Sequence, residues 1–533
     1  MKRTFYRYIS LALALAAALT LAGCGSLSLT EEELSELQQE EPQAVVGQTI
    51  GEELAPTYAA DHIFSLNCVP GESYNPFSTP SAWNRVVSML VYESLVIQDE
   101  NFSARPNLIT AWETTDGYNW TFTVDTSRTF HDGGTLTAMD AAYSLQTAMN
   151  YGSPYVARFR KVLGAAPVDS EHFVVNLSEA NYRFYELLDI PCVEYGTGFW
   201  DRPYGTGPYA FSDSGRYLRL DRNHPLADQM PLDTIHLKEY AAAVDILQAF
   251  EDSYIDLVIN DPTGLSSLGY SSTNIKKYVN TSNLHYIGYS TYSRVFSQSM
   301  FRNIVTYAID RDTIVAEVMK GAATATTVPI APQSDLYPED YARTLEYSPG
   351  GMEIALQNVG LTDLDLDGFL EFGGMQTTID FIVCSDTGTK VAAARNITSK
   401  LRSFGFDVSL RELGYNDYVA ELDRGTFDMY YAEVKLGPDW DLRPLLSIGQ
   451  DLNFGDVRDP ALEDLMVRVL STEGDALTAS TQELYEYIGR NAFITPICFE
   501  KSEVLYHRGV LSGLSPTQDN VFYGLENWTV DLS

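Results

Sequence analysis

The chain has 533 residues, of which 45% are hydrophobic and 12% aromatic, and its formal net charge is -37 at pH 7. This composition is typical of a globular protein and excludes a largely disordered chain, and the length suffices for two or three packed lobes. The negative charge repels phosphate backbones and anionic lipid headgroups, so we expect no nucleic-acid partner and no basic membrane-binding patch.

The N-terminus has the layout of a lipoprotein signal peptide. Three basic side chains within residues 1–8 precede an apolar run over 11–21, which is too short to span a bilayer stably. The run ends in Leu21-Ala22-Gly23-Cys24, which resembles the lipobox of bacterial lipoproteins. The resemblance implies that residues 1–23 are removed and that the Cys24 sulfur carries a diacylglycerol. We therefore expect an extracytoplasmic protein anchored by lipid to the bacterial cell membrane, at the cell surface or in the periplasm.

Residues 24–56 form an acidic segment. No Lys or Arg occurs between Tyr8 and Asn84, and eight glutamates lie between positions 31 and 53. Such a segment cannot bury enough apolar surface to fold alone, and its like charges repel one another. We predict a flexible linker, with a short helix at 30–39, that holds the globular body away from the membrane.

The next segments predict a mixed α/β protein. Residues 120–124 and 172–177 alternate between polar and apolar side chains, which indicates half-buried strands. Thr137 is a typical N-cap for a helix that continues to Met149. Apolar side chains at helical spacing predict one helix over 302–319, ended near Gly321.

The second half of the chain repeats a strand–helix–strand order. Strands are predicted over 378–384, 407–410 and 427–434, separated by helices over 391–404 and 415–424. This alternation favours a parallel or mixed sheet.

The motifs that indicate an enzyme are missing. The chain has no H-E-x-x-H, G-x-S-x-G, Walker or G-x-G-x-x-G pattern, so we expect no catalysis, no cofactor and no metal site. No C-x-x-C pair is present either. We favour isolated buried thiols, while an exported protein can also form disulfides, for the cysteines Cys68, Cys192, Cys384 and Cys498.

One acidic segment resembles the start of an EF-hand calcium loop. Its sequence is Asp363-x-Asp365-x-Asp367-Gly368, but position twelve of the loop is Gly374 rather than a bidentate Glu. Without that ligand, the segment predicts a solvated acidic turn between a helix and a strand.

A series of short motifs occurs in the order found in one protein family, and together they cover most of residues 60–530. The motifs are Tyr74-Asn75-Pro76-Phe77, residues 91–96, Pro106-Asn107-Leu108, Ala111-Trp112-Glu113, residues 116–122, Phe130-His131-Asp132-Gly133, residues 136–140, residues 204–209, Phe301-Arg302-Asn303, residues 308–311 and residues 363–368. Through them the chain resembles the extracellular solute-binding proteins of peptide and nickel ABC importers, family 5.

The resemblance implies an α/β fold of two lobes that close like a hinged clamp, the large periplasmic-binding-protein-like class with an extra subdomain in the first lobe. The first lobe is expected at 57–292, the second at 293–490, and 491–533 return to the first lobe. The chain is expected to cross between lobes near 286–292 and 491–497. His131 and Asp132 are expected to be scaffold rather than catalytic residues.

The family's buried aspartate, which meets the α-ammonium of a peptide ligand, matches Asp439. Glu433 and Lys435 precede it on one face of the predicted strand, where they either line the cleft or pair with each other at its rim. The predicted ligand-binding residues are Asp439, Trp440, Asp441, Glu433, Lys435, Tyr74 and Asn75.

The resemblance implies the substrate-binding protein of an ABC importer, a monomer that captures peptides between its lobes. It would deliver them to a membrane permease that is powered by a separate ATPase. The residues before Asp439 differ from the Gly-Trp of typical peptide binders. A non-peptide solute, such as a metal chelate, an opine or an oligosaccharide, is therefore an alternative, and a surface ligand sensor is another.

Overall fold

A computed structural model describes residues 62–261, 275–372 and 374–532. The chain divides into two compact units, Met1–Ala55 and Pro56–Ser533, and every described residue belongs to the second. The predicted signal peptide, the lipidation site Cys24, and the linker with its helix all lie outside the described residues. Within the described ranges, every helix is too short or too polar to cross a membrane.

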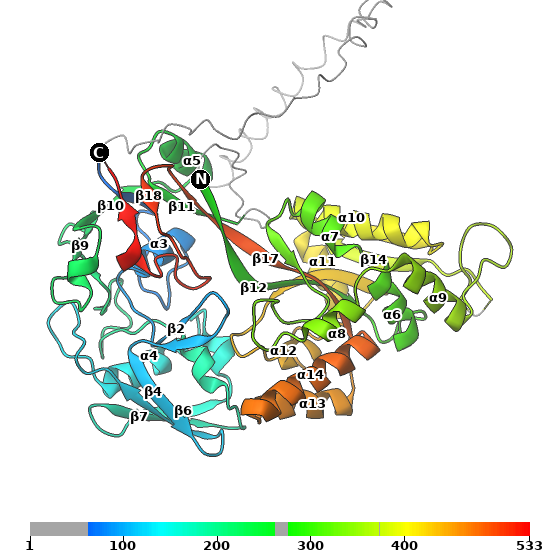
Figure 1. The fold of residues 1–533 in the computed structure, drawn as a ribbon, viewed down its shortest axis with the longest axis horizontal. Coiled ribbons are helices and arrows are strands. Elements are labelled where there is room, and N and C mark those ends of the chain that lie inside the picture. The colour runs from blue at the N-terminus through cyan, green and yellow to red at the C-terminus, as the bar shows by residue number, and fades with distance from the viewer. Residues whose placement is uncertain (1–61, 262–274, 373, 533) are drawn as a thin grey trace, which may run out of the picture. The chain divides into compact units, whose positions relative to one another are not determined.

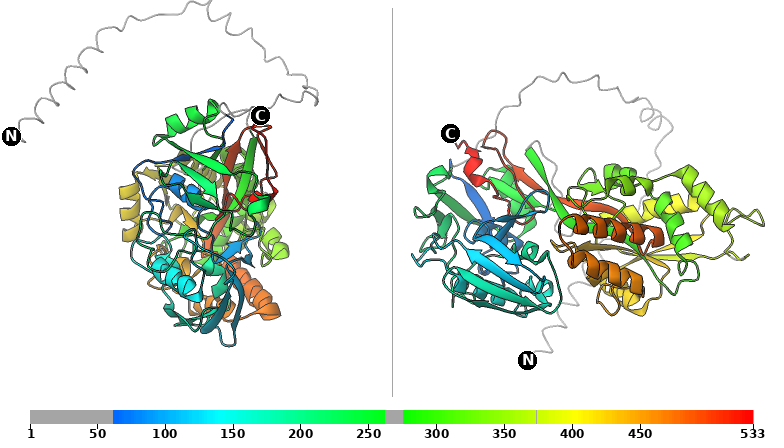
Figure 2. Two further views of the ribbon diagram at one scale, coloured as in Figure 1. Left: turned by 90° about the vertical axis from the view of Figure 1, so that its left-hand side faces the viewer. Right: turned by 60° about the horizontal axis from the view of Figure 1, so that its bottom comes forward.

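A long mixed sheet runs through both lobes. Its strand order is β15-β14-β16-β12-β17-β11-β1-β10-β9-β8, and β13 pairs with β17. Strands β12 (Ile275–Tyr289) and β17 (Ile494–Tyr506) pair antiparallel and run from one lobe to the other, as Figure 1 and the right-hand view of Figure 2 show. The other strands are β1 (Ser65–Cys68), β8 (Tyr209–Phe211), β9 (Tyr217–Leu220), β10 (Thr234–Glu239), β11 (Leu257–Asn260), β13 (Ala323–Ala325), β14 (Ile379–Cys384), β15 (Val408–Leu413) and β16 (Met429–Lys435).

Each lobe has its own hydrophobic core. The first-lobe cluster contains buried side chains from the N-terminal half of the body and from the C-terminal residues 504–528. Two further clusters belong to the second lobe, and one of them also includes Phe102 of the first lobe. Along β12, Val279 belongs to the first-lobe cluster and Leu284 to a second-lobe cluster. The pairing of β12 with β17 shifts register over the same stretch. The crossings predicted at 286–292 and 491–497 lie on the second-lobe side of this point.

The first lobe carries a separate four-stranded antiparallel sheet, ordered β4-β5-β7-β6, which together with α4 forms its extra subdomain. The predicted strands at 120–124 and 172–177 are confirmed as β5 (Asn119–Val124) and β7 (His172–Leu177). The helix predicted after Thr137 is α4 (Ala138–Ala148), and the Thr137 backbone N–H donates to the Asp140 carboxylate at 2.9 Å. This is the reciprocal half of a capping box.

The remaining described elements of the first lobe are short. They are β2 (Val96–Gln98), β3 (Ala104–Pro106), β4 (Ile109–Thr114), β6 (Val162–Pro167), β18 (Leu511–Ser512), β19 (Thr529–Val530), α3 (Ala82–Ser88), α5 (Ala243–Glu251), η1 (Val156–Phe159), η2 (Phe184–Leu188), η3 (Ala227–Gln229) and η5 (Leu525–Asn527).

The glycine motif at 205–208 forms close internal packing. A Cβ atom on Gly205 would lie 2.2 Å from the Val91 carbonyl oxygen, so only glycine allows this approach. His131 Nε2 lies 2.9 Å from the Gly207 carbonyl oxygen, and the Asp132 carboxylate accepts the Gly134 N–H at 2.8 Å. His131 and Asp132 therefore bond within the first lobe, as scaffold residues do.

The second lobe contains the predicted strand–helix–strand repeat. Strand β14 pairs in parallel with both β15 and β16, and β16 pairs antiparallel with β12, so the sheet is mixed. The helices are α10 (Gly388–Ser403) and α11 (Tyr415–Arg424). Because side chains alternate along β14, Phe381 and Val383 join the core that contains α10, while Ile382 joins the one that contains α11. The two helices thus cover opposite faces of the sheet.

The prediction of a single helix over 302–319 is wrong, because the helical segment is interrupted after Ala308. Helix α6 (Ser299–Ala308) stops before Ile309, whose backbone is extended at φ -89° and ψ 111°. Asp310 then caps α7 (Arg311–Thr313) by accepting the Thr313 N–H at 3.1 Å. The Arg311 Nε donates to the Pro496 carbonyl oxygen at 2.8 Å and fixes the break against β17. A local cap and a distant contact together override the helical periodicity.

The other helical segments of the second lobe are the π-helical η4 (Ile314–Val318), α8 (Glu339–Thr344), α9 (Pro349–Val359), α12 (Arg443–Leu446), α13 (Pro460–Leu470) and α14 (Gly474–Asn491). Residues 363–368 form the predicted turn between α9 and β14. The four cysteines in the described part of the chain are free thiols, and three of them are buried.

Candidate ligand-binding site between the lobes

The loop at residues 436–442 connects β16 to α12 and holds Trp440 in an unfavourable backbone conformation. Trp440 has φ +57°, a left-handed value that costs a non-glycine residue about 1–2 kcal/mol. Its ring is buried and packs edge-on against Phe102 and Phe499, with centroids 5.4 and 5.9 Å apart. Phe102 belongs to the first lobe, so this strained loop is held where the two lobes touch.

Asp439 is buried between the lobes, with 5% of its surface exposed. Its Oδ2 accepts a hydrogen bond from the Asn181 Nδ2 at 3.1 Å, and Asn181 follows β7 in the first lobe. Burial and then the charge of Asp441 raise the pKa of Asp439, while the charge of Arg183 opposes this rise. The Asp439 Oδ1 also accepts the Asp441 backbone N–H at 3.3 Å. A buried carboxylate that has two neutral donors and a nearby Arg is poised to accept a further cation.

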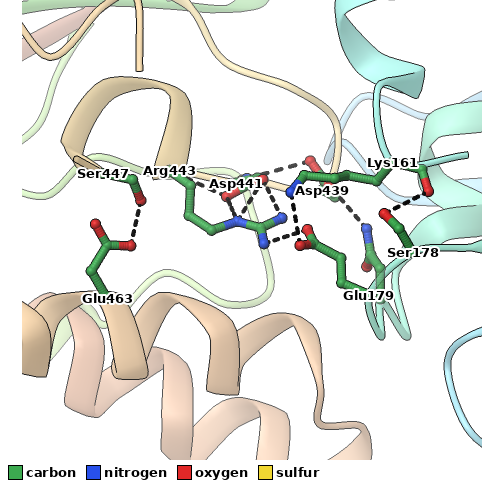
Figure 3. A network of polar contacts seen from close by, with 9 residues as sticks. Lys161, Ser178, Glu179, Asp439, Asp441, Arg443, Ser447 and Glu463 are labelled. Atoms are coloured by element: carbon green, nitrogen blue, oxygen red, sulfur yellow. Dashed lines mark hydrogen bonds and ion pairs between the residues drawn. The ribbon is translucent and has the colours of Figure 1, made fainter. Parts of the chain in front are cut away.

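Arg443 links the Asp439 loop to the first lobe by an ion-pair network, which Figure 3 shows. Its Nε and Nη2 donate to both oxygens of Asp441 at 2.7–3.0 Å, and its Nη1 pairs with Glu179 of the first lobe. Glu179 also pairs with Lys161 at 2.9 Å. Burial raises the pKa of Glu179, but Lys161 and Arg443 together bring it below its ordinary value. The network holds the two lobes against each other.

Several buried donors beside Asp439 are not fully used. Arg183 is a buried side chain whose Nη2 lies 3.5 Å from Glu186. Its Nε and Nη1, and the Trp440 indole Nε1, have no hydrogen-bond partner among the described residues. Unused N–H groups in a dry environment are costly, so they are favourable places for ligand acceptors.

Further contacts between the lobes surround these residues. The Tyr182 backbone N–H donates to the Leu470 carbonyl oxygen at 2.7 Å, where the end of α13 meets the first lobe. Arg160 and Asp451 form an exposed ion pair at 3.6 Å. Because Asp439 is enclosed by both lobes, a ligand reaches it only when the lobes separate.

Tyr74 and Asn75 lie in the first lobe and bond within it. Asn75 is 1% exposed; its Nδ2 donates to the carbonyl oxygens of Gly198 and Trp200 at 2.8 and 2.7 Å. The Tyr74 ring packs on Phe211, with centroids 4.8 Å apart. Burial raises the pKa of Tyr74 above its ordinary value. A ligand-binding role for either residue stays a prediction.

Glu433 and Lys435 do not pair with each other, so that alternative is wrong. Glu433 is half-buried and pairs with Lys390 of α10 at 2.6 Å. Lys435 lies 3.8 Å from Asp519, on the C-terminal segment that packs with the first lobe. The two side chains therefore have partners on different parts of the chain, a lysine of α10 for Glu433 and an aspartate of the C-terminal segment for Lys435.

The structure brings together residues that sequence reasoning did not select. Asn181, Arg183 and Glu179 meet the Asp439 loop from about 260 positions earlier in the chain. His285 and Glu500 gather beside Glu433 from β12 and β17. At the acidic turn, Glu371 joins Asp363, Asp365 and Asp367 and accepts the Leu364 N–H at 2.8 Å. A charged residue on a predicted strand, as Glu433 is on 427–434, was the available signal.

Two lobes joined by paired strands, with buried polar groups meeting between them, define a two-lobed ligand-binding protein. The model of the bacterial extracellular solute-binding proteins, family 5, matches residues 103–451, and the chain belongs to this family.

Known proteins of this kind share the fold at low sequence identity. The oligopeptide-binding protein AppA of Bacillus subtilis is 22% identical over 488 residues, which cover 85% of this chain and 88% of that protein. Its structure in complex with a nonapeptide matches 90% of this chain and 100% of its own, at 17% identity and a TM-score of 0.61. The structure of a nickel ABC transporter from Bacillus halodurans matches 86% of this chain and 98% of its own, at 19% identity and a TM-score of 0.71.

Proposed function

We propose that the protein is the substrate-binding component of an ABC importer and that it captures peptides between its lobes. It releases them to a membrane permease powered by a separate ATPase, acts as a monomer and performs no chemistry. A lipid on Cys24 holds it to the outside of the cell membrane. Membership of the extracellular family and the oligopeptide-binding name of the Bacillus subtilis relative support this proposal.

The observation that carries the proposal is the buried Asp439 carboxylate between the lobes. Burial and then the charge of Asp441 raise its pKa, and among the described residues no cation forms an ion pair with it. A peptide α-ammonium would supply that cation and would replace the Asn181 amide as donor at 3.1 Å. Lobe closure would exclude water and strengthen the pair.

The unused N–H groups of Arg183 would receive a ligand acceptor at the same site. In a short peptide this acceptor is the α-carboxylate or a backbone carbonyl, and Arg is suited to hold a carboxylate with two N–H groups. The Trp440 indole N–H provides a third donor. The donors and the single acid would thus orient an extended ligand by its polar groups and leave side-chain identity free.

A second candidate is a small anionic solute, such as an opine or a metal chelate. The observation that favours it is the buried Arg183 guanidinium, whose Nη2 lies 3.5 Å from Glu186 and whose Nε and Nη1 have no hydrogen-bond partner among the described residues. A nickel ABC transporter is among the proteins of similar fold. A solute of this kind would depend on Arg183 more than on Asp439.

Native mass spectrometry of the purified protein, before and after mild denaturation, tests the proposal. We expect a mixture of released masses that match short peptides, depleted in Asp439→Asn and retained in the surface control Asp340→Asn. A single non-peptide mass that persists in Asp439→Asn and disappears in Arg183→Gln would support the anionic solute instead. Bound peptide that is recovered cleaved would contradict the absence of chemistry.

A further inference from the structure

Three strands of the central sheet bring a histidine and two glutamates to one point. His285 of β12 lies directly opposite Glu433 of β16, and opposite Cys498 of β17 on its other side. Glu500 is two residues beyond Cys498 and so faces the same way. One nitrogen or oxygen atom from each of the three side chains lies within 4.8 Å of the others.

The His285 ring aims an unused nitrogen at the two acids. Its side chain is 1% exposed, and its Nδ1 lies 3.0 Å from the Tyr431 hydroxyl. Its Nε2 has no hydrogen-bond partner among the described residues. The nearest oxygens, from Glu500 and Glu433, are 3.7 and 4.0 Å away, beyond hydrogen-bond length. In the tautomer whose Nδ1–H donates to the Tyr431 hydroxyl, the Nε2 lone pair faces carboxylate oxygens, an arrangement that a bound cation makes favourable.

The groups around the cluster set its charge. Lys390 lies 2.6 Å from Glu433, and its side chain is 20% exposed. The Asn283 Nδ2 lies 3.3 Å from Glu500, and the Asp261 carboxyl also bonds to Glu500. Because the Lys390 side chain reaches solvent, it can leave Glu433 when a stronger cation arrives. Glu433 and Glu500 also hydrogen-bond to each other through a proton, which the ion displaces to solvent. The two carboxylates then balance the charge of a divalent ion.

We propose that His285, Glu433 and Glu500 form a binding site for a divalent transition-metal ion of the zinc type. Ligand atoms around a tetrahedral zinc ion lie about 3.4 Å apart, so the Nε2–oxygen separations of 3.7 and 4.0 Å need only a small contraction. An imidazole with two carboxylates selects zinc-like ions over calcium and magnesium, which prefer oxygen ligands alone. Tyr431 orients the ring through Nδ1, as outer partners of ligating histidines do.

The site lies on the strands that connect the lobes, so a bound ion would change the stiffness of this connection. Strands β12 and β17 connect the lobes, and their pairing shifts register between Asn280 and Leu284 and again between His285 and Tyr286. An ion bound here ties β12, β16 and β17 together beside these irregularities. It therefore stiffens the connection between the lobes. The metal site rests on these three strands alone and does not depend on the proposed peptide ligand.

Zinc binding to the purified full chain, first stripped with EDTA, tests the proposal by equilibrium dialysis and thermal unfolding. We expect one tightly bound zinc per chain, a higher melting temperature, and visible absorption bands of tetrahedral Co²⁺ when cobalt replaces zinc. Calcium and magnesium should give none of these effects. His285→Gln and Glu433→Gln should each weaken zinc binding at least about 100-fold, because removal of a mere outer partner already costs up to that much.

A variant that should bind zinc more tightly keeps the proposal testable even where a variant of a metal-binding residue fails to fold. Lys390→Met removes the competing ammonium, so zinc should bind roughly tenfold more tightly. Asp363→Asn, in the exposed acidic turn, is the matched control and should leave zinc binding unchanged. The proposal is overturned by no zinc uptake, by uptake lost in Asp363→Asn rather than in Glu433→Gln, or by unaltered affinity in Lys390→Met.

Discussion

Two loops of the protein are equally buried but differ in how their polar groups are satisfied. In the first lobe, Asn75 donates two hydrogen bonds and accepts a third from the Phe77 N–H at 2.9 Å, all from its own lobe. In the second lobe, Asp439 reaches across to Asn181. Trp440 beside it keeps an unused indole N–H and a left-handed backbone. Both loops carry family motifs, so neither burial nor resemblance separates them.

The difference teaches that incomplete pairing, rather than burial, identifies a candidate ligand site. A buried side chain whose donors and acceptors are all used stabilises its own lobe, and a ligand would gain nothing from it. A buried side chain with spare capacity, paired only across a movable contact, costs stability until a ligand arrives. The predictions below separate these two roles by measuring ligand affinity and stability on the same variants.

The largest effect is expected for Asp439→Asn. Loss of the charge should raise the Kd of a bound peptide at least about 100-fold, close to 3 kcal/mol, because the ligand ammonium loses its only acid partner. The melting temperature should stay the same or rise, because burial disfavours the ionised Asp439 carboxyl in the folded protein. Calorimetric titration and thermal unfolding measure the two quantities. An unchanged Kd would exclude Asp439 as the ammonium partner.

Asn75→Ala should show the opposite pattern. The change leaves one buried carbonyl oxygen, one partly buried carbonyl oxygen and one buried backbone N–H without their partner, so the free energy of unfolding should fall by about 2–3 kcal/mol. The Kd of the peptide should stay within about threefold. Asn176→Ala, which removes an exposed hydrogen bond to Asn119, is the control and should change stability by less than about 0.5 kcal/mol. Intact stability with lost binding would instead place Asn75 on the ligand.

Local patterns in the sequence predicted much of the fold. The helix expected at 415–424 has the same ends as α11, because apolar spacing and the glycine at 425 act within one segment. The break between Ala308 and Arg311 was missed, because it depends on the contact of Arg311 with Pro496, 185 positions away. Periodicity cannot report a cap that competes with the helix through tertiary contacts.

The candidate site was predictable only on one side. Asp439 and Asp441 were found through the family pattern, which is continuous in the chain. Asn181 and Glu179 were not, because they meet the loop across 258 and 264 positions and a single sequence carries no marker of such pairs. The same limit hid His285 and Glu500, whose proximity to Glu433 follows from strand register.

A smaller effect is expected when the contact between the lobes is weakened. Arg443→Met removes the ion pair with Glu179 while the Asp439 carboxylate remains in place. The free-energy difference between the arrangement with touching lobes and the one with separated lobes should change by about 1 kcal/mol. The equilibrium constant then shifts roughly fivefold toward separated lobes. Small-angle X-ray scattering of the ligand-free protein should then give a larger radius of gyration. Arg468→Met, whose partner Glu483 lies in the same lobe, should leave it unchanged.

The smallest effect is a difference in pH dependence between the two sides of the same network. The folded-state pKa of Glu179 is depressed below 4.5, so its contribution is present above that value and is lost only as pH falls through the lower folded pKa. The pKa of Asp439 is raised above 3.8, so as the pH falls this carboxyl loses its charge, and with it the affinity for a cationic ligand, at a pH above 3.8. Peptide affinity should therefore decline on acidification before the lobes separate in scattering. In Asp439→Asn, peptide affinity should no longer fall over this pH range. If the affinity of the wild-type protein falls only at or below pH 3.8, burial does not raise the pKa of this carboxyl.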